Sequence, residues 1–372
     1  MTLKKYSHVV IIGAGFAGAS TAWHLVRSGV RNVLIIERES FPGVHASGRN
    51  AGMIRQIIPD EALAPIVREG AEFIRKLPDE WPLPVEFRQT GSLLLGSGTA
   101  WGKLKADAGK ASMAGVSTES IRPSDARQRV SALENTEFEG AVWCPTDGVV
   151  DVHALLQGYL SQAQAGGAKI MTSTKVVGIE SRHGRIAGVV TDSGPIEADL
   201  VINAGGAWAM ELARMAGATP VPAHPYRRHL FTTDLLPWVR QEWPYVWNLT
   251  GEFYFRPESG GLLLSACDET KHVPGIPPAD PDAPLWLYDK LQRYPGLQNV
   301  SIRKTWACLR TMPDDGRFVI GWDPCLHGFF WVSGLGGHGV TASGAVGRIA
   351  ADLILGREKE PLTVSPARFF PS

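Results

Sequence analysis

A glycine-rich turn between an apolar strand and a helix constrains this chain more than any other feature. The stretch Gly13-Ala14-Gly15-Phe16-Ala17-Gly18 has the spacing G-x-G-x-x-G and follows the β-branched run His8–Ile12. Apolar residues then recur at helical spacing over Ala19–Val26. In such a turn the first glycine permits the bend, the second lets backbone approach a pyrophosphate, and the third packs helix against strand. The helix N-terminus then faces phosphate charge.

A carboxylate completes this motif about twenty residues further on. Glu37 ends the second apolar strand, Val33–Ile36, where a carboxylate would accept both hydroxyls of a ribose. The same negative charge disfavours a 2′-phosphate, so NADP is not expected. The turn and Glu37 together predict a Rossmann-type site for an ADP-containing dinucleotide.

The rest of the chain favours FAD over NAD. In a simple nicotinamide enzyme the remaining βα units would follow at once, but here a long glycine-rich loop over residues 39–56 intervenes. A second strand, glycine turn and helix come only at residues 328–355. Between these regions we expect helices at 61–77 and 151–165, then short strands with turns at His183-Gly184 and Ser193-Gly194.

An aromatic-rich stretch over residues 221–304 predicts an antiparallel sheet beside a pocket, although core packing is the alternative role of these rings. Strand alternation in Phe253–Arg256 puts Tyr254 and Arg256 on one face.

Composition excludes several classes of protein. With 37 basic and 37 acidic residues and a pI near 7.2, the chain lacks the basic surface that nucleic acid requires. Four scattered cysteines without a CxxC pair predict neither disulfides nor a metal site, and favour a reducing compartment. The stretch Val9–Val26 is interrupted by glycines and His24, so we expect no transmembrane segment, no signal peptide and a cytoplasmic protein.

Four stretches of the chain carry a family resemblance. They are "ERESFPGVHASGRNAGMIR" (37–55), "DLVINAGGAW" (199–208), "TWACLRTMPDDGRFVIG" (305–321) and "GLGGHGVTASGAVG" (334–347). Together they resemble the D-amino acid oxidase superfamily of FAD-dependent oxidoreductases, which includes glycine oxidase, sarcosine oxidase and D-arginine dehydrogenase. The resemblance covers nearly the whole chain, and its layout is most similar to D-arginine dehydrogenase.

This resemblance implies an α/β fold: a Rossmann-type FAD-binding domain with an antiparallel-sheet substrate domain. We expect the FAD-binding domain over residues 1–80, 145–221 and 305–372. The substrate domain is expected over residues 81–144 and 222–304.

The resemblance also assigns residues to the cofactor. The ADP side comprises Gly13, Gly15, Phe16, Ala17, Gly18, Glu37 and Arg38, with Val176 at the adenine. The pyrophosphate and flavin side comprises Ser47, Arg49, Asn50, Ala51, Gly52, Ala204, Gly205, Gly206, Arg310, Gly336, Gly337, His338, Gly339, Val340 and Thr341. A helix N-terminus at this last turn would favour the negative charge of a reduced flavin. For His338, the backbone is expected to matter more than the imidazole.

On the substrate side, the resemblance points to arginines. Arg310 matches the arginine that holds the substrate carboxylate in glycine oxidase, where a guanidinium grips both oxygens. Arg227 and Arg228 match a pair in D-arginine dehydrogenase, and we favour Arg227 because only one of two neighbours on a strand can face the pocket. Tyr254 matches an active-site tyrosine, with a core role as the alternative. Arg55 matches a carboxylate-binding arginine of sarcosine oxidases, with a surface arginine as the alternative.

Positions at which this chain differs from D-arginine dehydrogenase indicate which substrates to expect. Met53 and Ile58 stand where D-arginine dehydrogenase has histidine and tyrosine, and no acid lies near Thr90-Gly91. A cationic substrate is therefore not expected. Pocket arginines without a compensating carboxylate favour glycine, sarcosine, an acidic D-amino acid or iminodiacetate. An N-substituted glycine with a second carboxylate would use two arginines best.

Two features of the cofactor chemistry stay open. Cys308 stands where monomeric sarcosine oxidases bond their flavin covalently, but we favour an inert thiol and non-covalent FAD. The strand Gly260–Ala266 lacks the lysine that sarcosine oxidases use with oxygen, so the acceptor is O₂ or another oxidant.

We therefore expect FAD-dependent oxidation of a C–N bond in a small carboxylate-bearing amine, with hydride passing to flavin N5 and water hydrolysing the imine. The alternatives are a flavin 2-hydroxy-acid dehydrogenase, which would need a histidine base, and a flavin-binding subunit of a larger dehydrogenase.

Overall fold

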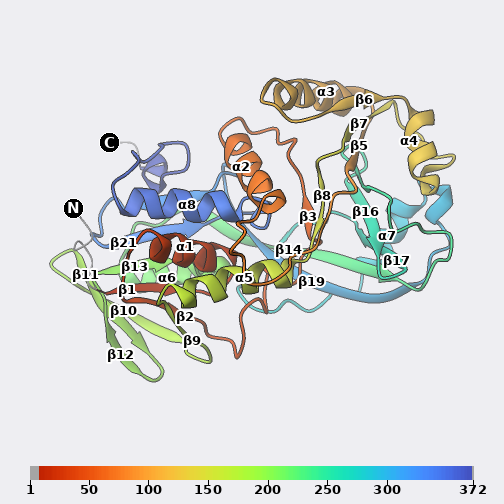
Figure 1. The fold of residues 1–372 in the computed structure, drawn as a ribbon. Helices are drawn as coiled ribbons and strands as arrows, with labels where there is room; N and C mark the ends of the chain where they lie inside the picture. The colour runs from red at the N-terminus through yellow and green to blue at the C-terminus, as the bar shows by residue number, and fades with distance from the viewer. Residues whose placement is uncertain (1–7, 371–372) are drawn as a thin grey trace.

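The computed structural model describes residues 8–370, and a parallel sheet forms its centre (Figure 1). Within these residues the sheet has six strands in the order β20-β21-β13-β1-β2-β9, parallel except for β20. The strands are β1 (Val9–Ile12), β2 (Val33–Ile36), β9 (Lys169–Met171), β13 (Leu200–Asn203), β20 (Val319–Trp322) and β21 (Phe329–Ser333). They read as short apolar runs because both faces of the sheet are covered.

The two faces of this sheet have different covers. Helices α1 (Phe16–Arg27), α2 (Leu63–Arg75), α5 (Val152–Ala165) and α8 (Ser343–Ile354) pack on one face. The other face is covered by α6 (Ala209–Ala216) and by the antiparallel sheet β10 (Val176–Arg182), β11 (Arg185–Thr191) and β12 (Gly194–Glu197). Alternation within β1 shows the cause, since Ile11 faces the first cover and Ile12 the second.

The two helices predicted between these strands are confirmed, and each is slightly shorter than predicted. The helix expected at 61–77 is α2, and the one expected at 151–165 is α5. The side chain of Asp151 caps α5 by accepting hydrogen bonds from two backbone amides of its first turn. His183 and Gly184 both adopt positive φ, as a tight hairpin between β10 and β11 requires.

The described residues also form a nine-stranded mixed sheet on the other side of the molecule. Its strands are β5 (Ser92–Gly96), β6 (Glu119–Ile121), β7 (Gly140–Cys144), β14 (Ala223–Thr233), β15 (Tyr245–Asn248), β16 (Phe253–Glu258), β17 (Gly261–Ser265), β18 (Thr270–Lys271) and β19 (Ile302–Pro313). Most pairs are antiparallel, but β15 and β5 run parallel. Helices α3 (Gly98–Met113), α4 (Pro123–Arg129) and α7 (Ala283–Leu291) lie around it.

Smaller elements connect the two sheets. A short sheet joins β3 (Met53–Ile54), β8 (Gly148–Val150) and β4 (Phe87–Arg88). The single-turn 3₁₀ helices are η1 (Ser131–Leu133), η2 (Gly206–Trp208), η3 (Pro295–Leu297) and η4 (Pro366–Phe369).

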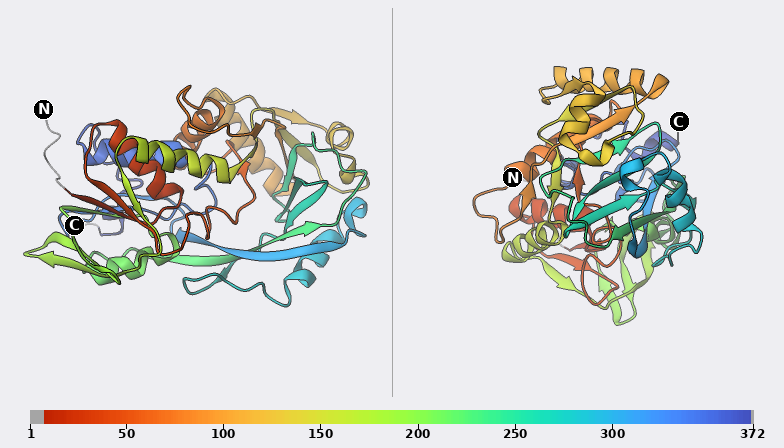
Figure 2. Two further views of the ribbon diagram at one scale, coloured as in Figure 1. Left: turned by 60° about the horizontal axis from the view of Figure 1, so that its bottom comes forward. Right: turned by 90° about the vertical axis from the view of Figure 1, so that its right-hand side faces the viewer.

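A long ribbon of β14 and β19 runs from one half of the molecule to the other (Figure 2). The proposed boundary between residues 304 and 305 lies inside β19, because this strand stays paired with β14 from Ile302 to Pro313. Among residues 8–370, the structure has no helix both long and apolar enough to cross a membrane.

Candidate functional site

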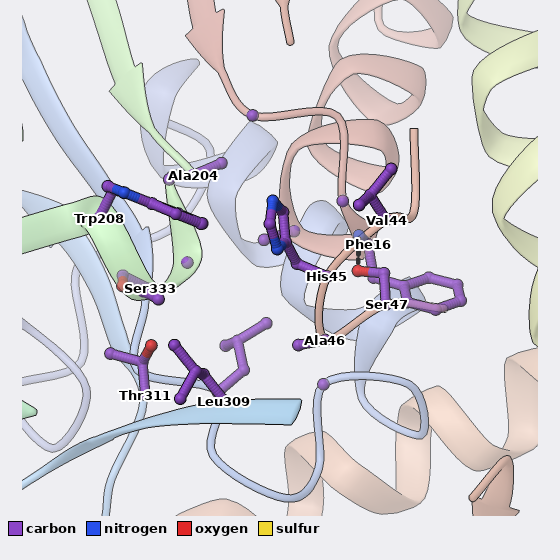
Figure 3. A pocket seen from close by; sticks show the side chains of 18 of the residues that line it. Phe16, Val44, His45, Ala46, Ser47, Ala204, Trp208, Leu309, Thr311 and Ser333 are labelled. Carbon is purple, nitrogen blue, oxygen red and sulfur yellow. Dashed lines mark hydrogen bonds between the residues drawn. The ribbon is translucent and has the colours of Figure 1, made fainter. Parts of the chain in front are cut away.

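The glycine turn between β1 and α1 forms one wall of a long pocket. Gly13 adopts a φ of +107°, and a Cβ there would lie 2.4 Å from the carbonyl oxygen of Ala204. A Cβ on Gly18 would lie 2.0 Å from the carbonyl oxygen of Gly13, so this glycine allows the helix to pack on the turn. Gly15 faces Ser47, whose hydroxyl accepts a 3.1 Å hydrogen bond from the amide of Phe16 (Figure 3). The roles assigned to Gly13 and Gly18 agree with these contacts, while the approach of a pyrophosphate to Gly15 stays a prediction.

Glu37 is held at the end of β2 by two backbone amides. Its Oε2 accepts a hydrogen bond from Ala14 N at 2.9 Å, and its Oε1 accepts one from Glu39 N at 3.0 Å. The side chain is buried and lines the pocket. Each carboxylate oxygen keeps a further lone pair, which a ribose hydroxyl could use.

Several residues of the pocket lining were not assigned by the sequence analysis, and Trp208 and His45 are two of them. Trp208 lies beside Arg38, whose guanidinium carbon is 4.5 Å from the indole centroid, and beside His45, whose ring centroid is 4.7 Å away. Figure 3 shows the His45 ring pointing toward Trp208 across the pocket. His45 also contacts Glu39 Oε1 at 2.9 Å. Trp208 lies two residues after the Gly205-Gly206 pair, which was the signal available for it.

Most residues assigned to the cofactor line this pocket. They are Gly13, Gly15, Phe16, Ala17, Glu37, Arg38, Ser47, Arg49, Asn50, Val176, Ala204, Gly205, Gly206, Arg310, Gly336, Gly337, Gly339 and Val340. Gly18, Ala51, Gly52, His338 and Thr341 are absent from its lining. The Ala51 carbonyl instead accepts a 2.7 Å hydrogen bond from Arg256 Nε, and the Thr341 hydroxyl donates to the Met53 carbonyl at 3.4 Å.

The pocket residues fit an anionic dinucleotide. Arg49 lines the pocket, and its buried Nε has no hydrogen-bond partner among the described residues. The open amides at the start of α1 lie on the same pocket. A pyrophosphate would satisfy both, while Glu37 would meet the ribose. Among the described residues, these are the groups that would hold FAD.

Arg310 lines this pocket from β19. Its Nη1 would lie 3.7 Å from a Cβ placed on Gly337, so the guanidinium lies against the glycine-rich turn before α8. No carboxylate of the described residues forms an ion pair with Arg310. Tyr254 is buried nearby, its hydroxyl has no hydrogen-bond partner among the described residues, and burial raises its pKa.

The structure corrects the choice between Arg227 and Arg228. In the ribbon Arg228 pairs with Cys308 and Tyr226 with Arg310, so Arg228 shares the face of Arg310. Arg227 pairs with Leu309 on the other face, where it forms an ion pair with Asp280. The preference for Arg227 was wrong because the register of β14 against β19 cannot be read from the sequence.

A second expectation also needs correction, since Arg228 has a compensating carboxylate. Its Nε donates to the Asp268 carbonyl at 3.0 Å, and its Nη2 forms an ion pair with Glu269. The positive charge of Arg228 is therefore largely neutralised. Glu269 lies three residues after the strand Gly260–Ala266 and outside the four family stretches, so no sequence signal connected it to Arg228.

Arg55 follows directly on β3, which brings it to the same region. Its guanidinium carbon lies 4.3 Å from the Trp247 ring centroid, and its buried Nε has no hydrogen-bond partner in the described part of the chain. No ion pair joins Arg55 to a carboxylate of the described residues. Burial lowers the pKa of Arg55, and the charge of Arg310 lowers it further. Met53 lies half-buried against the apolar cluster that includes Trp247.

His338 lies between these charges. Burial lowers its pKa to about 3, and the positive charges of Arg55 and Arg310 contribute. Its imidazole is therefore neutral at ordinary pH and a weak base.

Cys308 lines the pocket as a buried free thiol. Burial raises its pKa, although the nearby arginines oppose that shift. The thiolate, which would be the nucleophile toward a flavin, is disfavoured.

A family model described as FAD dependent oxidoreductase (DAO) matches residues 8–353. The chain belongs to this family. The predictions of the family, the D-amino acid oxidase fold and FAD as cofactor are thereby confirmed. The homologues found include FAD-dependent amino-acid oxidases and dehydrogenases that act on CH–NH donors.

Two solved structures illustrate the similarity. L-proline dehydrogenase from P. horikoshii is 28% identical, with a TM-score of 0.87 over 98% of this chain and 97% of that one. Iminodiacetate oxidase from Chelativorans sp. BNC1 is 25% identical, with a TM-score of 0.79 over 96% of this chain and 99% of that one.

A curated relative, the mitochondrial sarcosine dehydrogenase of Mus musculus, is 25% identical over 389 residues, covering 99% of this chain and 42% of the relative. The chain thus spans less than half the length of this relative.

Proposed function

We propose that this protein oxidises a C–N bond in a secondary amine that carries two carboxylates, an N-substituted glycine such as iminodiacetate. One observation carries the proposal: Arg55 and Arg310 lie in the same buried region, and neither is paired with a carboxylate of the described residues. Two unpaired guanidinium groups in a region of low dielectric repel each other, and two substrate carboxylates would offset both charges.

The chain's own residues account for substrate orientation. Arg310 would grip the carboxylate next to the reacting carbon, since it lines the cofactor pocket, and Arg55 would take the second carboxylate. FAD, when bound, supplies a hydride acceptor at flavin N5. The C–H hydrogen would leave with its bonding electron pair as a hydride, while the nitrogen lone pair forms the C=N bond of an iminium ion. Water would then hydrolyse this ion to an oxo acid and a protonated amine.

No strong base is required of the protein. The positive charges of Arg55 and Arg310, with desolvation, would lower the pKa of the bound amine and favour its neutral form. His338 is a poor base because its pKa is lowered to about 3. This argues against a 2-hydroxy-acid substrate, whose hydroxyl proton would need a base.

The similarity to an iminodiacetate oxidase and a sarcosine dehydrogenase supports a secondary amine, and so does the similarity to an L-proline dehydrogenase. The acceptor that reoxidises the flavin is O₂ or another oxidant. The scattered free cysteines support a cytoplasmic location.

A substrate panel tests the proposal. The purified yellow protein would be mixed anaerobically with iminodiacetate, sarcosine, glycine, L-proline, D-aspartate, D-arginine and 2-hydroxyglutarate, and loss of flavin absorbance would be recorded. We expect the largest kcat/KM for iminodiacetate. A larger kcat/KM for D-arginine or L-proline would contradict the proposal. No bleaching with any compound would instead indicate a flavin-binding subunit.

Variants would separate the two arginines. Arg310→Met should lower kcat/KM for every substrate by at least about a hundredfold, because each substrate has the carboxylate that Arg310 would bind. Arg55→Met should lower kcat/KM for iminodiacetate about tenfold more than kcat/KM for sarcosine. Admitting air and assaying peroxide would then show whether O₂ serves as acceptor.

A further inference from the structure

The carboxyl group of Asp147 is fully buried near Arg55 and has four donors within hydrogen-bond distance. Its Oδ1 accepts from Gln56 N at 3.1 Å and from Gln56 Nε2 at 2.9 Å. Its Oδ2 accepts from Ser92 Oγ at 2.7 Å and lies 3.1 Å from the Tyr245 hydroxyl. Asp147 lies in the turn between β7 and β8, and nothing in the proposed reaction yet uses it.

These contacts hold the backbone on both sides of Arg55. The Gln56 amide belongs to the peptide unit after Arg55, and it donates to Asp147. The Ile54 carbonyl belongs to the peptide unit before Arg55, and it lies 3.2 Å from the Tyr245 hydroxyl. Asp147 and Tyr245 therefore clamp the two peptide units that fix the start of the Arg55 side chain.

The same strand also holds the far end of that side chain. Tyr245 and Trp247 are two residues apart on β15, so they project from the same face. Tyr245 reaches the backbone beside Arg55, and Trp247 stacks against its guanidinium group. Both ends of Arg55 are thus oriented before any ligand binds.

Charge supplies a second link. Arg55 experiences the repulsion of Arg310 and the attraction of Asp147. In a region of low dielectric a carboxylate acts over several ångströms, without direct contact. Burial raises the pKa of Asp147, while its hydrogen bonds from Gln56 and Ser92 favour the ionised form. The ionised carboxylate would offset part of the repulsion between the two arginines.

We propose that Asp147 is the positioning residue of the Arg55 subsite: it clamps the Arg55 backbone, together with Tyr245, and provides the negative charge that opposes Arg310. This inference rests on the proposed function in one respect, because it takes Arg55 to bind the second carboxylate of the substrate.

Two substitutions separate the clamp from the charge. In Asp147→Asn the amide oxygen can still accept from Gln56, while the amide nitrogen faces Ser92 and Tyr245, whose hydroxyl stays near the Ile54 carbonyl. This variant removes the charge and keeps most of the clamp. Asp147→Ala removes both. The matched control is Asp323→Asn, because Asp323 is another buried carboxylate with several hydrogen bonds, in the loop after β20.

The first measurement is the binding of redox-inert acids to the holoenzyme, detected as a change in flavin absorbance. Diglycolate carries two carboxylates around an ether oxygen, and methoxyacetate carries one. We expect Asp147→Asn to lower the Kd of diglycolate about tenfold, because the negative charge that balances Arg55 would no longer oppose the second carboxylate of the ligand. The Kd of methoxyacetate should change less than about twofold. Asp323→Asn should change neither. Equal effects on the two acids, or no effect of Asp147→Asn, would overturn the charge role.

The second measurement needs no ligand, so it separates this inference from the proposed function. Hydrogen exchange at the Gln56 amide should be slow in the wild type and in Asp147→Asn, and at least about tenfold faster in Asp147→Ala. Unchanged exchange in Asp147→Ala would overturn the clamp. If wild-type protein fails to bind diglycolate, the proposed function fails, and fast exchange in Asp147→Ala would still support the clamp.

Discussion

Arg228 lies directly opposite Cys308 across the β14/β19 ribbon, so both side chains stand on the face that carries Arg310. Neighbouring Arg227 points to the other face and pairs with Asp280. The β14/β19 ribbon therefore places two consecutive arginines on opposite faces. Arg228 lies on the face that carries Arg310, and Arg227 lies on the other face.

This difference predicts unequal effects of two matched substitutions. Arg228→Met should raise KM for a carboxylate substrate about tenfold, because Glu269 would lose its partner and its negative charge would oppose the substrate. Arg227→Met should change KM less than about twofold. Steady-state kinetics on both variants, with their thermal unfolding as a folding control, would check this. The reverse order of effects would place Arg227 at the substrate.

Three glycine-to-alanine substitutions, one of them outside the turn, test the packing of the turn between β1 and α1, which forms one wall of the pocket. Gly15→Ala would place a Cβ 2.8 Å from Ser47 Oγ on the pocket surface, so we expect FAD to bind at least about tenfold more weakly. Gly18→Ala would meet the backbone of Gly13 at 2.0 Å and should prevent stable folding. Gly102 in α3 has open space around it, so Gly102→Ala should stabilise the protein by about 1 kcal/mol. Flavin content and thermal unfolding measure these effects, and normal FAD content in Gly18→Ala would refute the packing argument.

Partly buried His24 predicts acid sensitivity. Burial first, and then the charge of Arg27, lowers its pKa to about 4 from 6.5. A lowered pKa in the folded state contributes stability above pH 6.5 that is lost as pH falls toward 4. The free energy of unfolding should therefore decrease by up to about 3 kcal/mol over this range.

The free energy of unfolding would be measured with urea at pH 6.5 and at pH 4.5. The substitution His24→Gln should remove most of its decrease between these two pH values. The matched control is His153→Gln, because His153 is exposed at the start of α5 and should leave the pH dependence unchanged. An unchanged slope in His24→Gln would show that other groups cause the acid sensitivity.

The state of Cys308 predicts non-covalent FAD. Burial raises the pKa of this thiol and so disfavours the nucleophilic thiolate. Acid precipitation of the purified protein should leave the yellow colour in the supernatant, and Cys308→Ala should behave identically. A yellow pellet from the wild type, with a yellow supernatant from the variant, would establish a covalent bond through Cys308.

Local motifs were the part of the site that could be predicted. The turn at Gly13–Gly18 and the carboxylate of Glu37 are separated by one helix, and the chemistry of each follows from its neighbours in the chain. His45 was missed although it lies inside the family stretch at residues 37–55. Its role depends on the Trp208 ring, which reaches it from a segment more than 160 residues later.

The sequence by itself determined the parallel sheet, the dinucleotide turn and the set of arginines from which a substrate site could be drawn. Tertiary structure alone decided which of those arginines form an ion pair with a carboxylate of the described residues. The physical reason is that ion pairing depends on strand register and on contacts between distant segments. Arg228 on β14 meets Glu269, which lies in the segment between β17 and β18. Arg55 and Arg310 are 255 residues apart and share one buried region. Asp147 reaches the Arg55 backbone through the same kind of long-range packing.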